Sequence, residues 1–373
     1  MIGWRIRVCD LKAERSRFGA DVDAKIRTVL DRGWFILGQE GAAFEEEFAS
    51  YLGIPHAVGV GSGTEAIHLA LAAAGIGPGD EVLTTPLTAV PTVCAIQLAG
   101  AVPTFADVDP ETGLLDPEDV ARRITPRTRA IVPVHLYGQC APMDEILRIG
   151  RDGNITVIED CAQAHGARWR GRTAGSFGRF GCFSFYPTKN LGAYGDGGAV
   201  VTFDAEAAQT LRRMRNYGQV DRYRHVTRGW NTRLDEIQAA VLRVKLPQLE
   251  ARNATRRTLA ARYREKLRGA AVRPLSVDDR GEPVYHLFVV RSPERDRLRD
   301  ELAARGIESQ VHYPIPAHLQ EAFADLGHER GSFPRAEELA RCVLSLPLYP
   351  ELRPRQVDEI CEAVREIAGG EGR

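Results

Sequence analysis

The chain of 373 residues carries 49 Lys and Arg against 50 Asp and Glu, so its charge gives no reason to expect nucleic acid or an anionic membrane as a partner. No apolar run approaches the ~20 residues of a transmembrane helix, and the N-terminus lacks the apolar core of a signal peptide, so we expect a cytoplasmic protein. The seven cysteines are scattered without a Cys-x-x-Cys pair, which predicts reduced thiols, no disulfides and no metal site.

Short apolar strands alternate with helical patterns in the first part of the chain. Strands rich in Val, Ile and Phe, buried on both faces and separated by helices, indicate a mostly parallel sheet with helices on each side. The predicted strands are 57–60, 81–84, 102–106, 130–134, 155–159, 182–185 and 199–203, and the predicted helices are 65–74, 143–151 and 205–216.

The pattern changes after Asn231, where fewer and more amphipathic elements follow. A helical stretch runs from Leu234 past Pro247 towards Leu267. Further elements are a strand at 284–291, a helix at 296–305 that Gly306 closes, and a strand at 307–311. Because one core stops growing at roughly 250–300 residues, we predict a large domain, 1–245, and a smaller α+β domain, 246–373.

Lys189 is the most informative residue of the sequence. It lies in a serine- and threonine-containing run, residues 184–192, with a glycine-rich stretch at 195–198 after it and apolar strands on both sides. Burial and a nearby cation lower the pKa of a lysine, so that free amine is available to condense with an aldehyde cofactor. The alternative is a surface lysine in a glycine-rich loop.

A second motif is the glycine-rich turn at residues 59–66, between a predicted strand and a predicted helix. Bare backbone amides at a helix N-terminus bind anions, and Thr64 adds a hydroxyl, so the turn predicts a phosphate site. It also fits a loose dinucleotide fingerprint, which expects an acid at the end of the second strand, where this chain has Thr84 and Thr85. A third possibility is that the glycines only allow tight packing.

The third motif is the pair Glu159 and Asp160 at the end of an apolar strand. Burying an unpaired carboxylate is costly, so a cation must compensate it. A protonated pyridine nitrogen is one such partner, and Asp160 can supply the carboxylate while Glu159 points the opposite way. The alternative is that Asp160 caps a short helix.

Together these motifs resemble the pyridoxal-phosphate enzymes of aspartate-aminotransferase fold, and more closely the sugar aminotransferases of the DegT/DnrJ/EryC1/StrS family. The matching segments are 33–38, 62–66, 135–138, 159–166, 184–192, 231–240, 312–314 and 344–347. The resemblance implies an α/β protein of fold type I. Its large domain would hold a mostly parallel seven-stranded sheet flanked by helices, beside a smaller C-terminal α+β domain.

The resemblance also implies roles for individual residues. Lys189 would hold pyridoxal phosphate in a Schiff base, then act as general base and acid once the amino donor displaces it. Asp160 would pair with the ring nitrogen, and Gln163 would reach the ring hydroxyl. Further cofactor contacts would come from Gly63, Thr64 and Ser184 at the phosphate, and from Asn231 across a homodimer interface.

One position departs from the family pattern. The family usually stacks an aromatic ring on the cofactor from the loop after the second strand, and this chain has Ala89 there. A related branch that removes hydroxyl groups from keto sugars has histidine in place of the lysine, so Lys189 favours transamination.

The implied reaction transfers an amino group from L-glutamate to the ketone of a nucleotide-linked keto sugar. The motifs most resemble enzymes acting at carbon 3 of dTDP-keto-6-deoxy sugars; action at carbon 4, a keto-cyclitol substrate, or a pyridoxal-phosphate-binding regulatory protein are the alternatives. Candidate substrate contacts are Phe35, Tyr186, His312, Tyr313 and His318. Arginines between Arg212 and Arg233 could meet the diphosphate or simply form a solvated surface.

Overall fold

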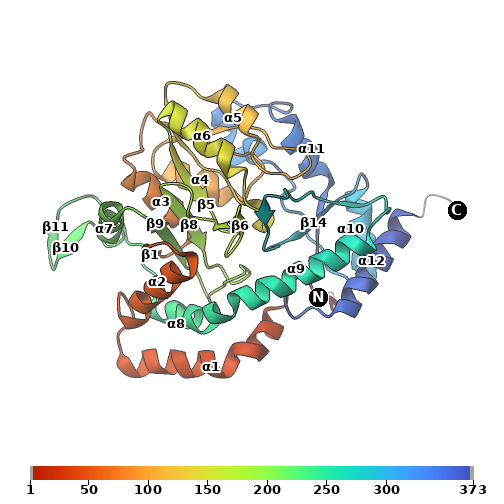
Figure 1. Ribbon diagram of the computed structural model, residues 1–373, viewed down its shortest axis with the longest axis horizontal. Coiled ribbons are helices and arrows are strands. Elements are labelled where there is room, and N and C mark those ends of the chain that lie inside the picture. The colour runs from red at the N-terminus through yellow and green to blue at the C-terminus, as the bar shows by residue number, and fades with distance from the viewer. Residues whose placement is uncertain (1–2, 370–373) are drawn as a thin grey trace.

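The centre of the structure, a computed structural model that describes residues 3–369, is a seven-stranded β-sheet (Figure 1). The strand order is β1-β9-β8-β5-β4-β2-β3, and only β9 runs against its neighbours, β1 and β8. The strands are β1 His56–Val60, β2 Glu81–Thr84, β3 Val102–Phe105, β4 Thr128–Ile131, β5 Thr156–Asp160, β8 Phe180–Ser184 and β9 Gly198–Thr202. The predicted mostly parallel sheet is therefore confirmed.

Helices cover both faces of this sheet because side chains along each strand alternate between two apolar cores. Val157 and Val201 face the core built with α2, α6 and α8, whereas their neighbours Ile158 and Val200 face the core built with α3, α4 and α7. The helices of this part are α1 Leu11–Arg32, α2 Gln39–Leu52, α3 Gly63–Ala73, α4 Val90–Leu98, α5 Pro117–Arg123, α6 Met143–Gly153, α7 Ala205–Met214 and α8 Glu236–Lys245.

A second, separate core lies in the C-terminal part of the chain. It is built on the sheet β12-β14-β15, whose strands are Arg273–Pro274, Phe288–Arg291 and Val343–Leu346. Its helices are α9 Leu249–Lys266, α10 Arg295–Ala304 and α12 Pro354–Ala368, and α11 Pro334–Cys342 packs nearby. Ile6 also packs in this core, although the sequence analysis grouped the N-terminal segment with the large domain. The division after residue 245 stays a prediction.

Several predicted elements differ from the structure, and the strand predicted at 284–291 forms only at Phe288–Arg291 (β14). The strand predicted at 307–311 is wrong: Ile307 forms a bridge with Ile6, whereas Gln310 forms one with Ser345, so the segment changes partner before a ladder can grow. The helical stretch through Pro247 divides into α8 and α9 at a 3-10 turn, Leu246–Gln248. The remaining short elements are β6 Arg168–Trp169, β7 Arg172–Thr173, β10 Gln219–Asp221, β11 Arg224–His225, β13 Gly281–Glu282 and the 3-10 turns Leu136–Gly138, Ala317–Leu319 and Glu321–Leu326.

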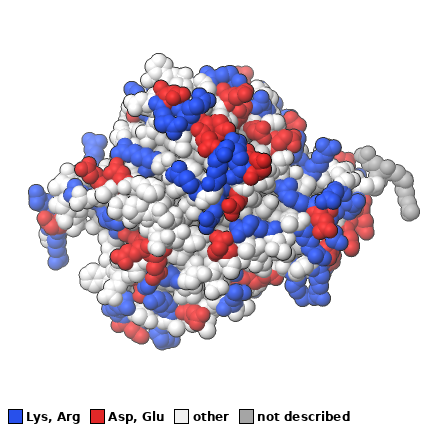
Figure 2. Space-filling view, in the orientation of Figure 1, with Lys and Arg blue, Asp and Glu red and all other residues white. Residues whose placement is uncertain are grey.

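The surface carries both signs of charge. On the face drawn in Figure 2, basic and acidic side chains are interspersed over the molecule, as the near-zero net charge leads one to expect. Within residues 3–369, none of the helices is long and apolar enough to cross a membrane.

A buried carboxylate ties the helix α2 to the helix α8. The side chain of Glu236, 1% exposed, accepts hydrogen bonds from the backbone N–H groups of Gly38 (3.0 Å), Glu40 (2.8 Å) and Gly41 (2.8 Å). These are donors at the start of α2 that lack partners within the helix. The N–H of Glu236 in turn donates to the carbonyl of Phe35 at 2.9 Å, so this contact also holds the loop before α2.

We expect Glu236→Ala to lower the free energy of unfolding by about 3 kcal/mol, because three backbone donors lose their acceptor inside the protein. Urea unfolding followed by circular dichroism measures the change. The matched control is Glu362→Ala on the exposed side of α12, which should change stability by less than about 0.5 kcal/mol. Equal stability of the two variants would show that the capping contact contributes little.

Candidate active site

A cavity of about 310 Å³ lies at the carboxyl ends of the central strands. This edge is where open α/β sheets place their ligand sites. The cavity brings together seven residues that the sequence analysis selected: Gly63, Thr64, Asp160, Gln163, Ser184, Tyr186 and Lys189. Segments far apart in the sequence, after β1, β2, β4, β5 and β8, therefore meet in one site.

The N-terminus of α3 forms one wall of the cavity. Ser62 caps this helix, since its hydroxyl oxygen accepts from the N–H of Glu65 at 3.2 Å. Gly63 and Thr64 begin the helix, so their N–H groups have no intrahelical acceptor and are free to bind an anion. A Cβ at Gly63 would lie 2.6 Å from Cβ of Ser184, so glycine is also needed for close packing. Close packing at Gly63 is therefore confirmed, and the phosphate site at this turn stays a prediction.

Asp160 ends β5 and is 4% exposed. Its Oδ1 accepts from the N–H of Ala162 at 3.0 Å, and its Oδ2 accepts from the hydroxyl of Thr92 at 2.8 Å. Burial raises the pKa of this carboxyl, while these two donors and the charge of Lys189 oppose the rise. A carboxylate oxygen can accept more than one hydrogen bond, so Asp160 keeps acceptor capacity beside the cavity.

Lys189 lies in the loop after β8, where its backbone N–H donates to the carbonyl of Tyr186 at 2.9 Å. Burial lowers the pKa of its amine to about 8, and the negative charge of Asp160 opposes that shift. Of the two causes that the sequence argument named, burial acts here, and a nearby cation is not among the causes of the shift. Near neutral pH a fraction of Lys189 is the free, nucleophilic amine.

The amide of Gln163 is held in one orientation. Its Oε1 accepts from the backbone N–H of Tyr137 at 2.7 Å, so its Nε2 is the donor to the hydroxyl of Tyr313 at 3.0 Å. The hydroxyl of Tyr137 donates to the carbonyl of His312. These contacts join the end of the central sheet to the segment that carries two of the candidate substrate residues.

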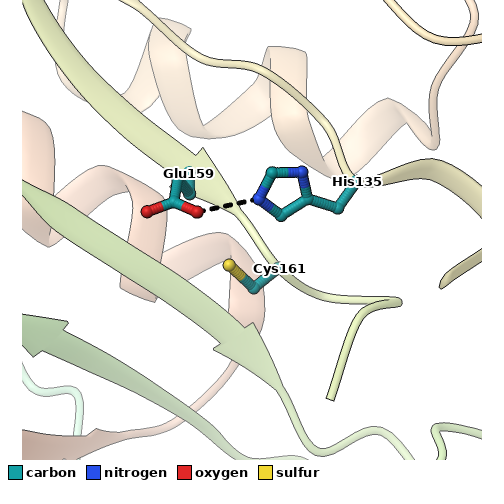
Figure 3. A group of neighbouring side chains, drawn as sticks. All are labelled: His135, Glu159 and Cys161. Carbon is teal, nitrogen blue, oxygen red and sulfur yellow. Dashed lines mark hydrogen bonds and ion pairs between the residues drawn. The ribbon is translucent and has the colours of Figure 1, made fainter. Parts of the chain in front are cut away.

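Glu159 points away from Asp160, as the alternation along a strand predicts. Figure 3 shows its carboxylate beside the imidazole of His135, with Cys161 below. Nδ1 of His135 accepts from the N–H of Ala141 at 3.0 Å, so Nε2 carries the proton that it donates to Glu159 at 2.9 Å. Glu159 also accepts from three backbone N–H groups, those of Gly175, Phe177 and Gly178.

These three side chains are near enough to one another to hold a metal ion. The nitrogens of His135 and the oxygens of Glu159 are, however, already engaged in hydrogen bonds. Burial and the charge of Glu159 raise the pKa of Cys161, which disfavours the thiolate that binds metals. The cluster is better explained as a hydrogen-bonded support for the end of β5, and the absence of a metal site stays a prediction.

His312 lines a second cavity, of about 600 Å³, together with Thr188, which precedes Lys189 in the sequence. Other residues that line it are His286, Arg256 and parts of the N-terminal segment. Burial and the charge of Lys189 lower the pKa of His312 to about 4, so its imidazole is neutral at physiological pH.

The other candidates lie outside these linings. His318 is 2% exposed, with its Nε2 3.1 Å from Oε1 of Glu337 and its ring packed on Phe333. This placement is structural, and we leave His318 out of the proposed site. Phe35 (46% exposed) and Asn231 are on the surface of the chain.

The predicted arginine-rich surface divides into two groups. Arg215 pairs with Glu45 and donates to the carbonyl of Gly59, and Arg233 donates to Asn216, so both hold the fold together. Arg222, Arg224 and Arg228 are exposed on and beside the β10–β11 hairpin, which projects from the molecule in Figure 1.

Sequence reasoning missed Thr88, Thr92 and Asp196, which also line the first cavity. Thr92 lies in the first turn of α4, where threonine is common, and the contact with Asp160 spans 68 positions of the sequence. The alternation of strands and helices predicts that residues after the end of β2 can line a ligand site. It does not indicate which threonine there contacts Asp160.

A model of the DegT/DnrJ/EryC1/StrS aminotransferase family matches residues 17–365. The chain belongs to this family. The resemblance read from the sequence motifs is thereby confirmed.

Members of the DegT/DnrJ/EryC1/StrS family match almost the full chain. A dTDP-3-amino-3,4,6-trideoxy-alpha-D-glucose transaminase of Streptomyces venezuelae is 48% identical over 366 residues, covering 98% of this chain and 96% of the relative. A pleiotropic regulatory protein of Geobacillus stearothermophilus is 43% identical over 366 residues, covering 97% and 98%. The crystal structure of S. venezuelae DesV in complex with a ketimine intermediate superposes with a TM-score of 0.96 at 48% identity, covering 98% of each chain. The predicted aspartate-aminotransferase-like fold, fold type I, is confirmed.

We expect the rate at which the protein without cofactor reacts with added pyridoxal phosphate to rise with pH and to level off above about 8, the pKa that burial gives Lys189. Stopped-flow absorbance at the band of the bound cofactor measures this rate. In Asp160→Asn the midpoint should move to lower pH, because the carboxylate that stabilises the protonated amine is gone. A rate that keeps rising towards the ordinary lysine pKa of ~10.4 would contradict the assignment.

Proposed function

We propose that this protein transfers an amino group from L-glutamate to carbon 3 of a dTDP-linked keto-6-deoxy sugar, with pyridoxal phosphate as cofactor. The observation that carries the proposal is one cavity lined by an amine of lowered pKa, a buried carboxylate and a helix N-terminus. The relatives that are sugar transaminases support the reaction and the reacting carbon.

The residues present fit pyridoxal phosphate. The start of α3 at Gly63 and Thr64 supplies donors for a phosphate, and Asp160 offers a carboxylate to a protonated ring nitrogen. The amide of Gln163 has a second N–H on Nε2, beyond the one given to Tyr313, for the ring hydroxyl. Bound pyridoxal phosphate would supply an aldehyde and an electron sink for the amino group transfer.

Lys189 would act as the general base and general acid of the reaction. Its free amine would hold the cofactor at the aldehyde carbon, with loss of water, and as a free base it would carry a proton from one carbon to another. Asp160 would keep the ring nitrogen protonated throughout. A histidine at this position, as in the dehydratase branch, would not form that bond, so Lys189 favours transamination over dehydration.

The keto sugar would extend from the first cavity towards the second. Tyr186 lines the first cavity and is 53% exposed, while His312 lines the second, and Gln163 connects to Tyr313. Neutral His312 can donate or accept a hydrogen bond with a sugar hydroxyl without adding charge.

We propose a homodimer in which each active site takes residues from both subunits. Four consecutive apolar residues before α2 are exposed: Trp34 (62%), Phe35 (46%), Ile36 (37%) and Leu37 (39%). Such a run on a surface marks an interface. Phe35 and Asn231 would contribute to the partner subunit's sugar and phosphate sites.

A regulatory protein that binds the cofactor without turnover is the alternative, and one relative is named a pleiotropic regulatory protein. The transaminases among the relatives, at 48% identity over almost the full chain, support an enzyme instead. The two functions differ in whether glutamate is consumed.

We expect the wild-type protein to release 2-oxoglutarate from L-glutamate in a half-reaction, with loss of the chromophore of the bound cofactor. Lys189→Ala should lose both the chromophore and the half-reaction, because no other group of the cavity can form the bond. Absorbance spectra and chromatography of 2-oxoglutarate measure the two outcomes, with exposed Lys12→Ala as the matched control. A stable chromophore with no 2-oxoglutarate from any amino donor would favour the regulatory role.

Carbon 3 can be tested separately. When the amino form of the enzyme is offered a dTDP-3-keto-6-deoxyhexose or its 4-keto isomer, we expect at least about tenfold higher kcat/KM for the 3-keto sugar, equivalent to ~1.4 kcal/mol in transition-state binding. Mass spectrometry and NMR of the amino-sugar product identify the carbon. A preference for the 4-keto sugar would overturn the choice of carbon and leave the aminotransferase function standing.

A further inference from the structure

Two threonine hydroxyls form a hydrogen-bonded chain that ends at the carboxylate of Asp160. The hydroxyl of Thr92 lies 2.8 Å from Oδ2 of Asp160, and the hydroxyl of Thr88 lies 3.0 Å from that of Thr92. Both threonines are 2% exposed and line the first cavity. Thr88 precedes α4, and Thr92 is in the first turn of that helix.

The direction of these hydrogen bonds follows from counting protons. An ionised carboxylate can only accept, so Thr92 donates its single hydroxyl proton to Asp160. The contact between the two threonines then needs a donor, and only Thr88 has a proton left to give. While Asp160 is ionised, the hydroxyl of Thr88 therefore donates to the hydroxyl of Thr92, which donates to the carboxylate of Asp160.

We propose that Thr92, oriented by Thr88, is a positioning residue that holds Asp160 ionised and aimed at the ring nitrogen of the cofactor. The proposal rests on the cofactor assignment made above. It assigns to α4 a function at the ring edge, although Ala89, just before this helix, is too small to stack on the ring face.

Asp160 needs such a donor because its burial works against ionisation. Burial raises its pKa, and the contact with Thr92 lowers it. The titratable groups facing it are Lys189, whose positive charge favours ionisation of Asp160, the imidazole of His135, and the side chains of Tyr313, Cys161 and Cys182, whose charged forms Asp160 disfavours. Removing the hydroxyl of Thr92 should raise the pKa of Asp160, so that the carboxylate protonates at higher pH and the ring nitrogen loses its partner there.

The test compares Thr92→Val, which keeps the shape and removes the hydroxyl, with Thr92→Ser, which keeps the hydroxyl. The measurement is the dissociation constant of pyridoxal phosphate from the full chain between pH 5 and 9, followed by absorbance and fluorescence. We expect about tenfold weaker binding in Thr92→Val at neutral pH, in line with the loss of a hydrogen bond to a charged group. Its loss of affinity on acidification should begin at higher pH than in wild type, and Thr92→Ser should restore both values.

A double-mutant cycle with Asp160→Asn separates positioning from packing. If Thr92 acts through the carboxylate, Thr92→Val should weaken cofactor binding far less in the Asp160→Asn background than in wild type. An equal loss in both backgrounds, or unchanged affinity and pH profile in Thr92→Val, would overturn the proposal. Failure of the wild-type protein to bind pyridoxal phosphate would instead overturn the function on which it rests.

Discussion

The structure of the site depends on two adjacent carboxylates at the end of one buried strand. Burying a carboxylate is costly unless donors satisfy it. Glu159 and Asp160 meet this constraint in different ways because successive side chains of β5 point to opposite faces. Glu159 receives one imidazole N–H and three backbone N–H groups, whereas Asp160 receives one hydroxyl and one backbone N–H.

Because of this difference, Glu159 has a structural role and Asp160 can bind a ligand. A carboxylate with four donors has no capacity left for a ligand, so Glu159 fixes the position of the strand end against the turn at 175–178. Asp160 keeps free acceptor capacity next to the cavity, and Lys189 supplies the nearby positive charge that helps to offset its burial. The same burial raises the pKa of Asp160 and lowers the pKa of Lys189. One buried environment therefore shifts the pKa values of both groups towards neutral pH.

Much of this site was predictable because parallel strands end at one edge of a sheet. Gly63, Asp160 and Lys189 each follow or end an apolar run, so their meeting follows from the topology without any contact being known. The capping contact of Glu236 and the hydroxyl of Thr92 were not predictable in this way, since each joins segments far apart in the sequence through a common residue type. The strand predicted at 307–311 was wrong because its bridge partners, Ile6 and Ser345, belong to different segments.

His318 illustrates the same limit for function. The sequence places it five positions after Tyr313, near enough to share a site, yet the 3-10 turn Ala317–Leu319 directs it to Glu337 and Phe333. Tyr313 instead remains connected to the cavity, because Gln163 can donate to it only while the N–H of Tyr137 fixes the amide. Proximity in sequence therefore did not decide which side chain is connected to the cavity. The hydrogen bond from Gln163, at the end of the central sheet, connects Tyr313 to it.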